Sequence, residues 1–312
     1  MGYAVVLGEA LVDLLESDLS GELIYRQAIG GGPLNVSVGA TRLGGDVRYV
    51  GSLSNDILGD RLSAFLRTAG VNIHGVKRVP VPTTLAVTTF EGAEPTFTFY
   101  GEPPSYALLE PGDLNTAEIA AADVLYTGSI CLLREPFRNA ARAAWQVPGP
   151  LRVFDPNIRP TLLPDAAALD TVRTMVEEFF ATADLVKLSS ADAAVLYDGA
   201  EPPAAAEHIR KLGAKAVVVT WGARGAFVAA EDGTAMLTAP KVDAVDATGA
   251  GDSVMGALIS RLLSTGFPPG LAGWQSNVRF ALAVAGLVCE RQGGATAMPT
   301  NEDLTARWGA LV

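Results

Sequence analysis

Short strand-like runs alternate with helix-like segments along most of this 312-residue chain. In its first part, β-branched runs lie at 4–7 and 47–50, and segments of helical apolar periodicity lie at 33–43 and 58–69. Neighbouring parallel strands need a long crossover, which is usually a helix, so this alternation predicts an α/β fold with a mostly parallel sheet. We find no linker-like tract and predict one domain over residues 1–312.

The pattern resumes after a different stretch in the middle. Further strands are expected at 123–126, 151–154, 185–188 and 216–220, and further helices at 135–145 and 169–181. Between the two parts, residues 83–100 alternate apolar and polar side chains with a period of two around a turn at 91–94. This period is typical of strands, and we predict a β-hairpin outside the main sheet. Because ligands of open α/β sheets bind beyond the carboxyl ends of strands, the residues that follow the strands are the candidates for chemistry.

Acidic residues outnumber basic ones by 34 to 23, which gives a net charge of −11 at pH 7. A nucleic-acid-binding surface needs a basic face, so we expect small-molecule partners or a second copy of the chain instead. The uncharged apolar segment at 280–289 is much shorter than the roughly 18 residues that a membrane-spanning helix needs. No basic stretch precedes the first apolar segment, and we therefore expect a cytoplasmic protein.

The most informative stretch, at 246–252, is a glycine-rich turn that opens a long helical pattern. Small residues let backbone N–H groups converge on an anion, and the helix dipole attracts negative charge to the same end. A carboxylate at Asp252 would repel a phosphate bound there, unless its task is to take a proton from an attacking hydroxyl, as in a kinase. The alternative is that Asp252 only caps the helix and that Gly249 and Gly251 only shape the turn.

A second glycine cluster, at 30–32, also opens a helix, with Pro33 at a position where its missing N–H is harmless. Asn35 lies one turn into that helix and can hydrogen-bond a polyol as well as an anion, and no lysine nearby favours a phosphate. Asp13 follows the first strand and can accept two hydrogen bonds from a sugar diol. Turn geometry and a solvated loop acid are the alternative readings of these two features.

Other familiar sites are missing from the sequence. No Gly-x-x-x-x-Gly-Lys-Ser/Thr occurs and no Gly-x-Gly-x-x-Gly follows a strand, so neither a P-loop nor a dinucleotide-binding turn is expected. The only two histidines, His74 and His208, are far apart along the chain. They provide little for a histidine-rich zinc site or a Ser-His-Asp triad.

Together, these motifs resemble the ribokinase-like (PfkB) family of carbohydrate kinases over residues 8–299. The stretch at 30–45, continuing to Gly59, is similar to the N-terminal signature, and Asp-Ala-Thr-Gly-Ala-Gly-Asp at 246–252 is similar to the C-terminal one. The resemblance implies a three-layer α/β/α ribokinase-like domain with a mostly parallel central sheet. It also implies a small β-sheet lid, from segments near 14–29 and 80–101. Such a lid can cover its own pocket or pair with the lid of a second subunit, and we expect a homodimer.

The resemblance further implies ATP and Mg²⁺ and assigns residues to the site. Asp252 would be the catalytic base, beside an anion hole formed by Gly249, Ala250 and Gly251. The sugar-binding positions match Asp13, Gly31, Gly32 and Asn35, and the nucleotide-binding loop matches Thr220, Gly222 and Gly225. Asp246 matches a residue that in some members helps to bind a monovalent cation, which leaves a K⁺ requirement as an open question.

One stretch departs from the family pattern. Where the family often has Asn-x-x-Glu near the phosphates and magnesium, this chain has Ser189 and Asp192. Asp192 keeps the charge but is shorter by one methylene, so we expect weaker or water-mediated help to Mg²⁺. Lys187, two residues earlier, is expected to bind ATP together with Ser189 and to compensate for the missing amide.

The stretches at 8–13 and 154–160 look most like the fructokinase branch of the family, and Arg159 is expected to reach the substrate or the γ-phosphate. The expected reaction is phosphorylation of the primary hydroxyl of D-fructose, giving fructose 6-phosphate and ADP. A 2-keto-3-deoxygluconate kinase, which binds an acid sugar, is the nearest alternative, and another sugar or nucleoside kinase of the family is a further one. A non-catalytic sugar or nucleotide sensor is the alternative of a different class.

Overall fold

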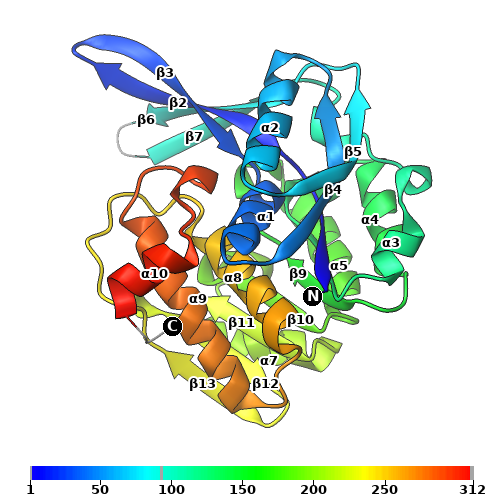
Figure 1. Cartoon of the computed structure of the whole chain (residues 1–312), viewed down its shortest axis with the longest axis vertical. Helices are drawn as coiled ribbons and strands as arrows, with labels where there is room; N and C mark the ends of the chain where they lie inside the picture. Colours follow the sequence, from blue (N-terminus) through cyan, green and yellow to red (C-terminus); the bar gives the residue numbers. More distant parts are fainter. Residues whose placement is uncertain (1, 92–93, 310–312) are drawn as a thin grey trace.

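The computed structural model describes residues 2–91 and 94–309, and it contains the large sheet that the sequence predicts (Figure 1). Within these residues, nine strands lie in the order β13-β12-β11-β10-β9-β8-β1-β4-β5. The strands are β1 (Tyr3–Leu7), β4 (Asp46–Ser54), β5 (Asn72–Val79), β8 (Val124–Gly128), β9 (Leu151–Asp155), β10 (Leu185–Ser189), β11 (Ala216–Thr220), β12 (Ala226–Ala230) and β13 (Gly233–Leu237). All pairs from β11 to β5 are parallel, while β12 and β13 add an antiparallel edge. The predicted mostly parallel sheet is confirmed.

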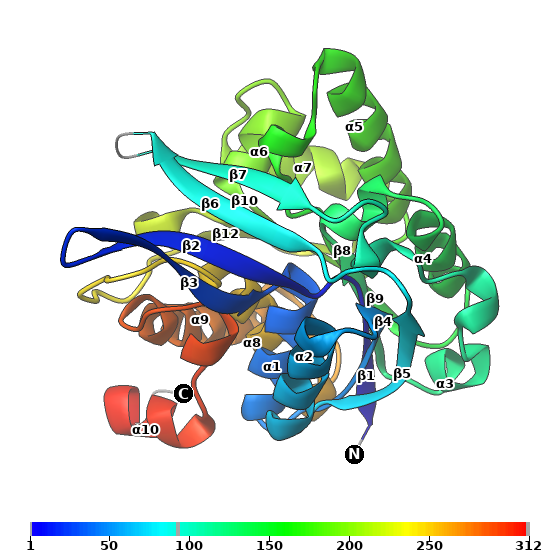
Figure 2. The ribbon, with the colours of Figure 1, turned by 90° about the horizontal axis from the view of Figure 1, so that it is seen from above.

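Helices cover both faces of this sheet, as the view from above shows (Figure 2). One layer contains α1 (Gly32–Arg42), α2 (Ile57–Thr68), α8 (Ala250–Thr265) and α9 (Leu271–Cys289), with α10 (Asn301–Trp308) packed on α9. The other contains α3 (Thr116–Ala120), α4 (Phe137–Trp145), α5 (Ala166–Phe180), α6 (Ser190–Leu196) and α7 (Pro202–Leu212). The helices predicted at 33–43, 58–69, 135–145 and 169–181 are α1, α2, α4 and α5, with ends shifted by a few residues. In the part of the chain that the structure describes, no helix has the length and apolar character to cross a bilayer.

The strands of the sheet divide the interior into two cores. Successive side chains of a strand point to opposite faces. In β1, Ala4 and Val6 pack in the core under α1 and α8, whereas Val5 and Leu7 pack in the core on the opposite face. All four are fully buried, which explains why this strand is an unbroken apolar run in the sequence. The expected three-layer α/β/α arrangement is confirmed.

A second sheet extends from one side of the large one and forms the expected lid (Figures 1 and 2). It contains β2 (Leu11–Leu19), β3 (Glu22–Gly30), β6 (Leu85–Glu91) and β7 (Glu94–Tyr100), in the order β3-β2-β6-β7. The hairpin predicted at 83–100 is β6 and β7, and the middle of its predicted turn, 92–93, lies outside the described residues. The first lid segment begins at Leu11 rather than near residue 14, because Val12 and Asp13 already pair with β3.

Helices α1 and α8 approach each other through glycine residues. A Cβ at Gly39 of α1 would lie 3.8 Å from the Cα of Gly256 in α8. A Cβ at Gly256 would lie 3.0 Å from backbone atoms of α1. Larger side chains at this crossing would therefore push the two helices apart. The contact matters for the site because α1 carries Asn35 and α8 carries Asp252, both near the start of their helix.

We expect Gly256→Val to lower the free energy of unfolding by about 1–3 kcal/mol, because extra atoms in a closely packed contact force the backbone to shift. Denaturant unfolding measures this loss. Ser264→Val places the same side chain at an exposed position of the same helix and is the matched control, with an expected change within about 0.5 kcal/mol. Equal stability of the Gly256 variant and the wild type would contradict the close helix contact.

Candidate active site

The carboxyl ends of the central strands and the inner side of the lid enclose a cavity of about 690 Å³. Its lining includes Asp13 and Arg26 of the lid, Gly31, Gly32 and Asn35 at the start of α1, Gly249, Gly251 and Asp252 at the start of α8, and Arg159 after β9. The structure thus gathers the predicted sugar-binding residues, the predicted base and most of the predicted anion hole from distant parts of the chain. The parallel sheet accounts for this, because its strands end at one common edge.

The start of α8 is built to meet an anion. Its N-cap, Gly249, has a φ of 79°, and a Cβ there would lie 2.9 Å from a neighbouring backbone atom, so glycine is needed for both conformation and space. First-turn amides have no acceptor within the helix, and the helix dipole adds positive potential. The N–H of Ala250 donates to the carbonyl of Ala247 at 3.1 Å. First-turn geometry therefore leaves the amides of Gly251 and Asp252 for an anion.

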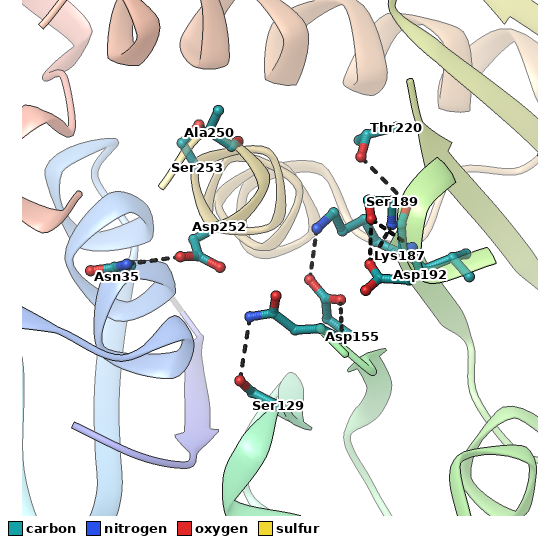
Figure 3. Close-up of polar contacts among 12 residues, drawn as sticks. Asn35, Ser129, Asp155, Lys187, Ser189, Asp192, Thr220, Ala250, Asp252 and Ser253 are labelled. Carbon is teal, nitrogen blue, oxygen red and sulfur yellow. Dashed lines mark hydrogen bonds and ion pairs between the residues drawn. The ribbon is translucent and has the colours of Figure 1, made fainter. Parts of the chain in front are cut away.

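Asn35 holds the carboxylate of Asp252 in place, as Figure 3 shows. Its Nδ2 donates to Oδ2 of Asp252 at 2.8 Å and so joins α1 to α8. Burial raises the pKa of Asp252 above its ordinary value, against the opposing effects of Asn35, Lys187 and Arg159. A raised pKa makes a carboxylate a stronger base toward a hydroxyl. The Oδ1 of Asn35 is buried and has no hydrogen-bond partner among the described residues, so it is available to a ligand.

Asp13 faces the cavity from β2. A Cβ at Gly30 would lie 2.0 Å from Oδ2 of Asp13, which explains why glycine occupies that position of the 30–32 cluster. Burial raises the pKa of Asp13 to about 6, and Arg159 lowers it by a smaller amount. The carboxylate therefore accepts hydrogen bonds at neutral pH and is protonated in mildly acidic solution. Asp13 is placed to accept hydrogen bonds from hydroxyl groups of a ligand.

Arg159 is held by hydrogen bonds within its own loop. Its Nη1 donates to Oδ1 of Asn157 at 2.6 Å and to the carbonyl of Ile158 at 3.2 Å. Asn157 in turn donates from Nδ2 to Oγ of Ser129 at 3.3 Å. The guanidinium lines the cavity and acts to lower the pKa of both carboxylates described above. Arg159 thus provides positive charge on the sugar side of the site.

Lys187 forms a buried ion pair with Asp155, next to the start of α8 (Figure 3). Its Nζ lies 2.8 Å from Oδ2 of Asp155, and the two side chains are 4% and 0% exposed. Burial acts to lower the pKa of Lys187, but Asp155, with smaller effects of Asp192 and Asp252, outweighs it and holds the value above the ordinary one. Burial raises the pKa of Asp155 to about 6, so both groups are charged at neutral pH. Because a Cβ at Gly251 would lie 3.1 Å from Nζ, this cation stands beside the anion-binding turn.

Ser189 and Asp192 cap α6. The N–H and Oγ of Ser189 both donate to Oδ2 of Asp192, at 2.8 and 2.6 Å, and the N–H of Asp192 donates back to Oγ at 3.0 Å. Oδ1 of Asp192 accepts from the N–H of Ile158 at 2.9 Å. With both oxygens engaged, Asp192 suits a metal ion held through water better than direct coordination. Within residues 2–91 and 94–309, no three acidic, histidine or cysteine side chains gather closely enough to hold a metal ion.

The predicted nucleotide-binding loop lies beside this capping pair. Thr220 ends β11 directly opposite Ser189, because β10 and β11 pair in parallel in that register. The following turn contains Gly222 and Gly225, with φ values of 52° and 109°, where glycine is favoured. These residues do not line the cavity with Asp13, and Figure 3 places Thr220 and Ser189 on the far side of the α8 start from Asn35. The predicted sugar-binding residues and the predicted nucleotide-binding residues therefore lie on opposite sides of the first turn of α8, and we refer to these as the sugar half and the nucleotide half.

Asp246 braces the loop that leads into α8. Its Oδ1 accepts from the N–H of Thr248 and its Oδ2 from the N–H of Gly293, each at 2.9 Å. Burial acts to raise its pKa, but these hydrogen bonds outweigh burial and hold the value below the ordinary one. The predicted role of Asp246 at a monovalent cation stays a prediction.

Among the lining residues that were not singled out for the site from the sequence are Glu9 and Ser129. Glu9 comes two residues after β1, and Ser129 comes directly after β8 with a φ of 71°. The rule that ligands bind beyond the carboxyl ends of parallel strands points to both positions. The sequence contained this signal, but it did not show which residues after each strand face inward.

Comparisons with known proteins agree with this arrangement. The model of the pfkB family of carbohydrate kinases matches residues 1–301. A fructokinase of Klebsiella pneumoniae is 33% identical over 312 residues, which cover 97% of this chain and 98% of the relative. Fructokinase-1 of Zea mays is 32% identical over 314 residues, which cover 96% of this chain and 95% of the relative.

Solved structures show the same similarity. A fructokinase of Xylella fastidiosa with bound ATP superimposes with a TM-score of 0.86 at 28% identity, covering 97% of each chain. A fructokinase of Vibrio cholerae O395 with bound fructose, ADP and calcium ion also gives a TM-score of 0.86 at 28% identity, covering 98% of each chain. The family match spans nearly the whole chain, and the predicted base, the start of α8 and the lid surround one cavity. This chain belongs to the pfkB family of carbohydrate kinases and is a sugar kinase.

Proposed function

We propose that this sugar kinase transfers the γ-phosphoryl group of ATP to the primary hydroxyl of D-fructose, producing fructose 6-phosphate and ADP. The observation that carries the proposal is the Asp252 carboxylate, held by Asn35 at the start of α8 inside the cavity that Asp13 lines. The fructokinases to which the chain is similar support the choice of sugar, and the structure with bound fructose and ADP supports it further.

In the proposed reaction each of these residues has a task. Sugar hydroxyls donate to Asp13 and to Oδ1 of Asn35, which orients the primary hydroxyl toward Asp252. Asp252 takes the hydroxyl proton while the sugar oxygen attacks the γ-phosphorus in line, and the bond between that phosphorus and the ADP oxygen breaks. The amides at the α8 start and the ammonium of Lys187 offset the charge on the transferring group. A closed lid excludes the water that would otherwise accept the phosphoryl group.

The charge of the cavity favours a neutral sugar over an acid sugar. Its lining contains five acids and two arginines: Glu9, Asp13, Glu16, Asp246, Asp252, Arg26 and Arg159. An acidic lining repels a carboxylate, whereas carboxylates are good acceptors for the hydroxyls of a polyol. Both arginines also have partners already, since Arg26 donates to Gln292 and Arg159 to Asn157. D-Fructose suits this lining better than 2-keto-3-deoxygluconate.

Mg²⁺ bound to ATP would supply charge neutralisation at the phosphates. The residues present fit such an ion when it is held mainly by phosphate oxygens and water, with Asp192 reaching it through water. Asp246, at the loop before α8, is the proposed neighbour of a K⁺ ion. Solved structures of the Vibrio cholerae O395 fructokinase with fructose and ADP also hold calcium ion or, in a double mutant, potassium ion, which supports a cation requirement in general.

One observation favours a second enzyme function, a kinase for a sugar acid, and another argues against a sensor. Arg26 and Arg159 do line the cavity, so a sugar acid has guanidinium groups within the site to pair with. A protein that only senses sugar or nucleotide has no need of a base, yet Asp252 is buried and held by Asn35 as a base should be. The substrate test below separates these functions.

We expect ADP release with ATP, Mg²⁺ and D-fructose, and little or none with 2-keto-3-deoxygluconate, ribose or adenosine. A coupled ADP-release assay over these acceptors, with and without K⁺, measures it. Turnover with the sugar acid alone would overturn the choice of fructose while leaving the mechanism. Saturable fructose binding without turnover at any Mg²⁺ concentration would favour a sensor.

The matched control for that assay is Asp252→Asn, which keeps the shape of the side chain and an acceptor for Asn35. Its turnover should fall by about 10²–10⁴-fold, the usual contribution of a general base. Its melting temperature should equal or exceed that of the wild type, because the substitution removes a buried charge. Near-normal turnover would mean that another group takes the proton.

The affinity for fructose should weaken as the pH falls through about 6, because protonated Asp13 loses accepting capacity. At about pH 7.5 the KM for fructose of Asp13→Asn should exceed that of the wild type by about 10- to 100-fold, since hydrogen bonds to a charged group are lost. At about pH 5 the two values should converge. A ratio that stays constant over this range would place the titration on a different group.

The same raised pKa also affects the free energy of unfolding. The contribution of neutral Asp13 to this free energy is present at low pH and is lost as the pH rises through about 6.

We also propose that the protein is a homodimer whose lids pack together. The lid strands β2 and β3 expose Leu19, Leu23 and Tyr25, at 60%, 62% and 45%. Leu23 and Tyr25 share one face of β3, whereas Leu19 pairs with Glu22 and so lies on the other face. Exposed apolar side chains on a small sheet are typical of an interaction surface. Light scattering should give twice the mass of the chain, and Leu19→Asp with Leu23→Asp should give a monomer. A wild-type protein with the mass of one chain would contradict the proposal.

A further inference from the structure

Glu9 is a buried acid whose task the mechanism above does not explain. It lies two residues after β1, is 1% exposed and lines the sugar half of the site. Its Oε1 accepts a hydrogen bond from the N–H of Gly32 at 3.1 Å. Its Oε2 is also buried and has no hydrogen-bond partner among the residues that the structure describes. A buried carboxyl oxygen without a donor is costly, so this group needs an explanation.

The bond to Gly32 replaces a missing helix cap. Gly32 is the first residue of α1, and its N-cap, Gly31, has no side chain that can accept from the first turn. The first turn of α1 contains no acid either. Glu9 therefore caps α1 from 23 residues earlier in the chain. Its main chain also lies close against the same turn, because a Cβ at Gly31 would lie 2.6 Å from the carbonyl oxygen of Glu9.

The capped turn is where the reacting groups meet. A Cβ at Gly32 would lie 2.7 Å from Nδ2 of Asn157 and 3.4 Å from Oδ1 of Asp252. The carbonyl of Gly31 accepts the N–H of Asn35 at 2.9 Å, and Asn35 in turn holds Asp252. The position of this turn therefore decides where the sugar-binding amide and the base lie relative to each other.

The surroundings of Glu9 suit a neutral acid better than a carboxylate. The titratable groups that face it are Tyr49 of β4, Tyr106, Tyr126 of β8 and Cys131, with Arg159 as the cation among them. Burial raises the pKa of Glu9, and the nearby Cys131 and Ser129 oppose this only in part. In the neutral form Oε1 still accepts from Gly32, while the unpartnered Oε2 carries the proton and becomes a donor.

We propose that Glu9 is a neutral carboxylic acid that caps α1 and so positions the Gly31–Gly32 turn and Asn35 for the sugar. It is a positioning residue, because it acts on the substrate through this turn. The inference rests on the proposed function of the same site as a sugar kinase.

Steady-state kinetics of Glu9→Ala and Glu9→Gln test the positioning role. Glu9→Ala should raise the KM for fructose by about 10- to 100-fold, because a buried N–H at the sugar turn loses its acceptor. The KM for ATP should stay unchanged, since the nucleotide half lies beyond α8. Glu9→Gln keeps a neutral group with an acceptor and a donor, and its KM for fructose should stay within about threefold of the wild type. Equal loss in both variants would overturn the neutral form, and an unchanged KM in Glu9→Ala would overturn the positioning role.

Asp184→Ala is the matched control for general destabilisation. Asp184 is also a buried acid, 8% exposed, and its Oδ2 accepts the N–H of Arg152 at 2.7 Å. It precedes β10 and so lies at the amino edge of the sheet, away from the site. Its loss should lower the melting temperature without changing the KM for fructose. A rise in that KM comparable to the Glu9→Ala effect would show that any buried acid has this influence, which contradicts a specific role.

Infrared spectroscopy of the intact wild type and Glu9→Gln tests the protonation directly and needs no turnover. The wild type at neutral pH should show a carbonyl band of a protonated carboxyl group that the Glu9→Gln spectrum lacks. Absence of a difference would overturn the neutral form even if Glu9→Ala does not fold. If the wild type phosphorylates no sugar, the proposed function fails while this measurement still decides the state of Glu9.

Discussion

The crossing of α1 and α8 is the contact on which the site depends. Two glycines let the helices approach closely, and the Asn35–Asp252 hydrogen bond then joins residues 217 positions apart at 2.8 Å. Neither helix could bring its polar side chain to this point alone. Because the first turn of α8 also presents the amides of Gly251 and Asp252, the same crossing sets the distance between Asp252, the Gly31–Gly32 turn and the proposed phosphate position.

Buried acids dominate the electrostatics of this edge of the sheet. Burial is the main cause of the raised pKa values of Asp155 and Asp252. The buried ammonium of Lys187 offsets the negative charge of these two carboxylates. Removing these charged groups from water costs free energy. The fold tolerates this cost because two large apolar cores, one on each side of the sheet, stabilise it. Raised pKa values and incomplete hydrogen bonding are typical of functional sites. There, groups that lower the stability of the fold are kept because binding or catalysis needs them.

Ser189 and Asp192, which replace the Asn-x-x-Glu of the family pattern, have a structural role in this chain. In this chain the two side chains form a capping box that starts α6, and Asp192 also ties down the loop that holds Arg159 through the N–H of Ile158. One carboxylate thus links the proposed nucleotide half to the proposed sugar half. Lys187, on the strand that precedes α6, adds the positive charge beside the anion-binding turn.

The sequence by itself determined the fold class, the lid hairpin and the principal catalytic candidate. Apolar periodicity and glycine-rich turns are local properties, so strands such as 4–7 and the turn before Asp252 are readable without coordinates. Only the tertiary structure decided that Lys187 pairs with Asp155, that Ala250 has its own acceptor and that Glu9 caps α1. Those contacts depend on strand register and on the spacing of helices across a sheet, which bring together residues that no local pattern connects.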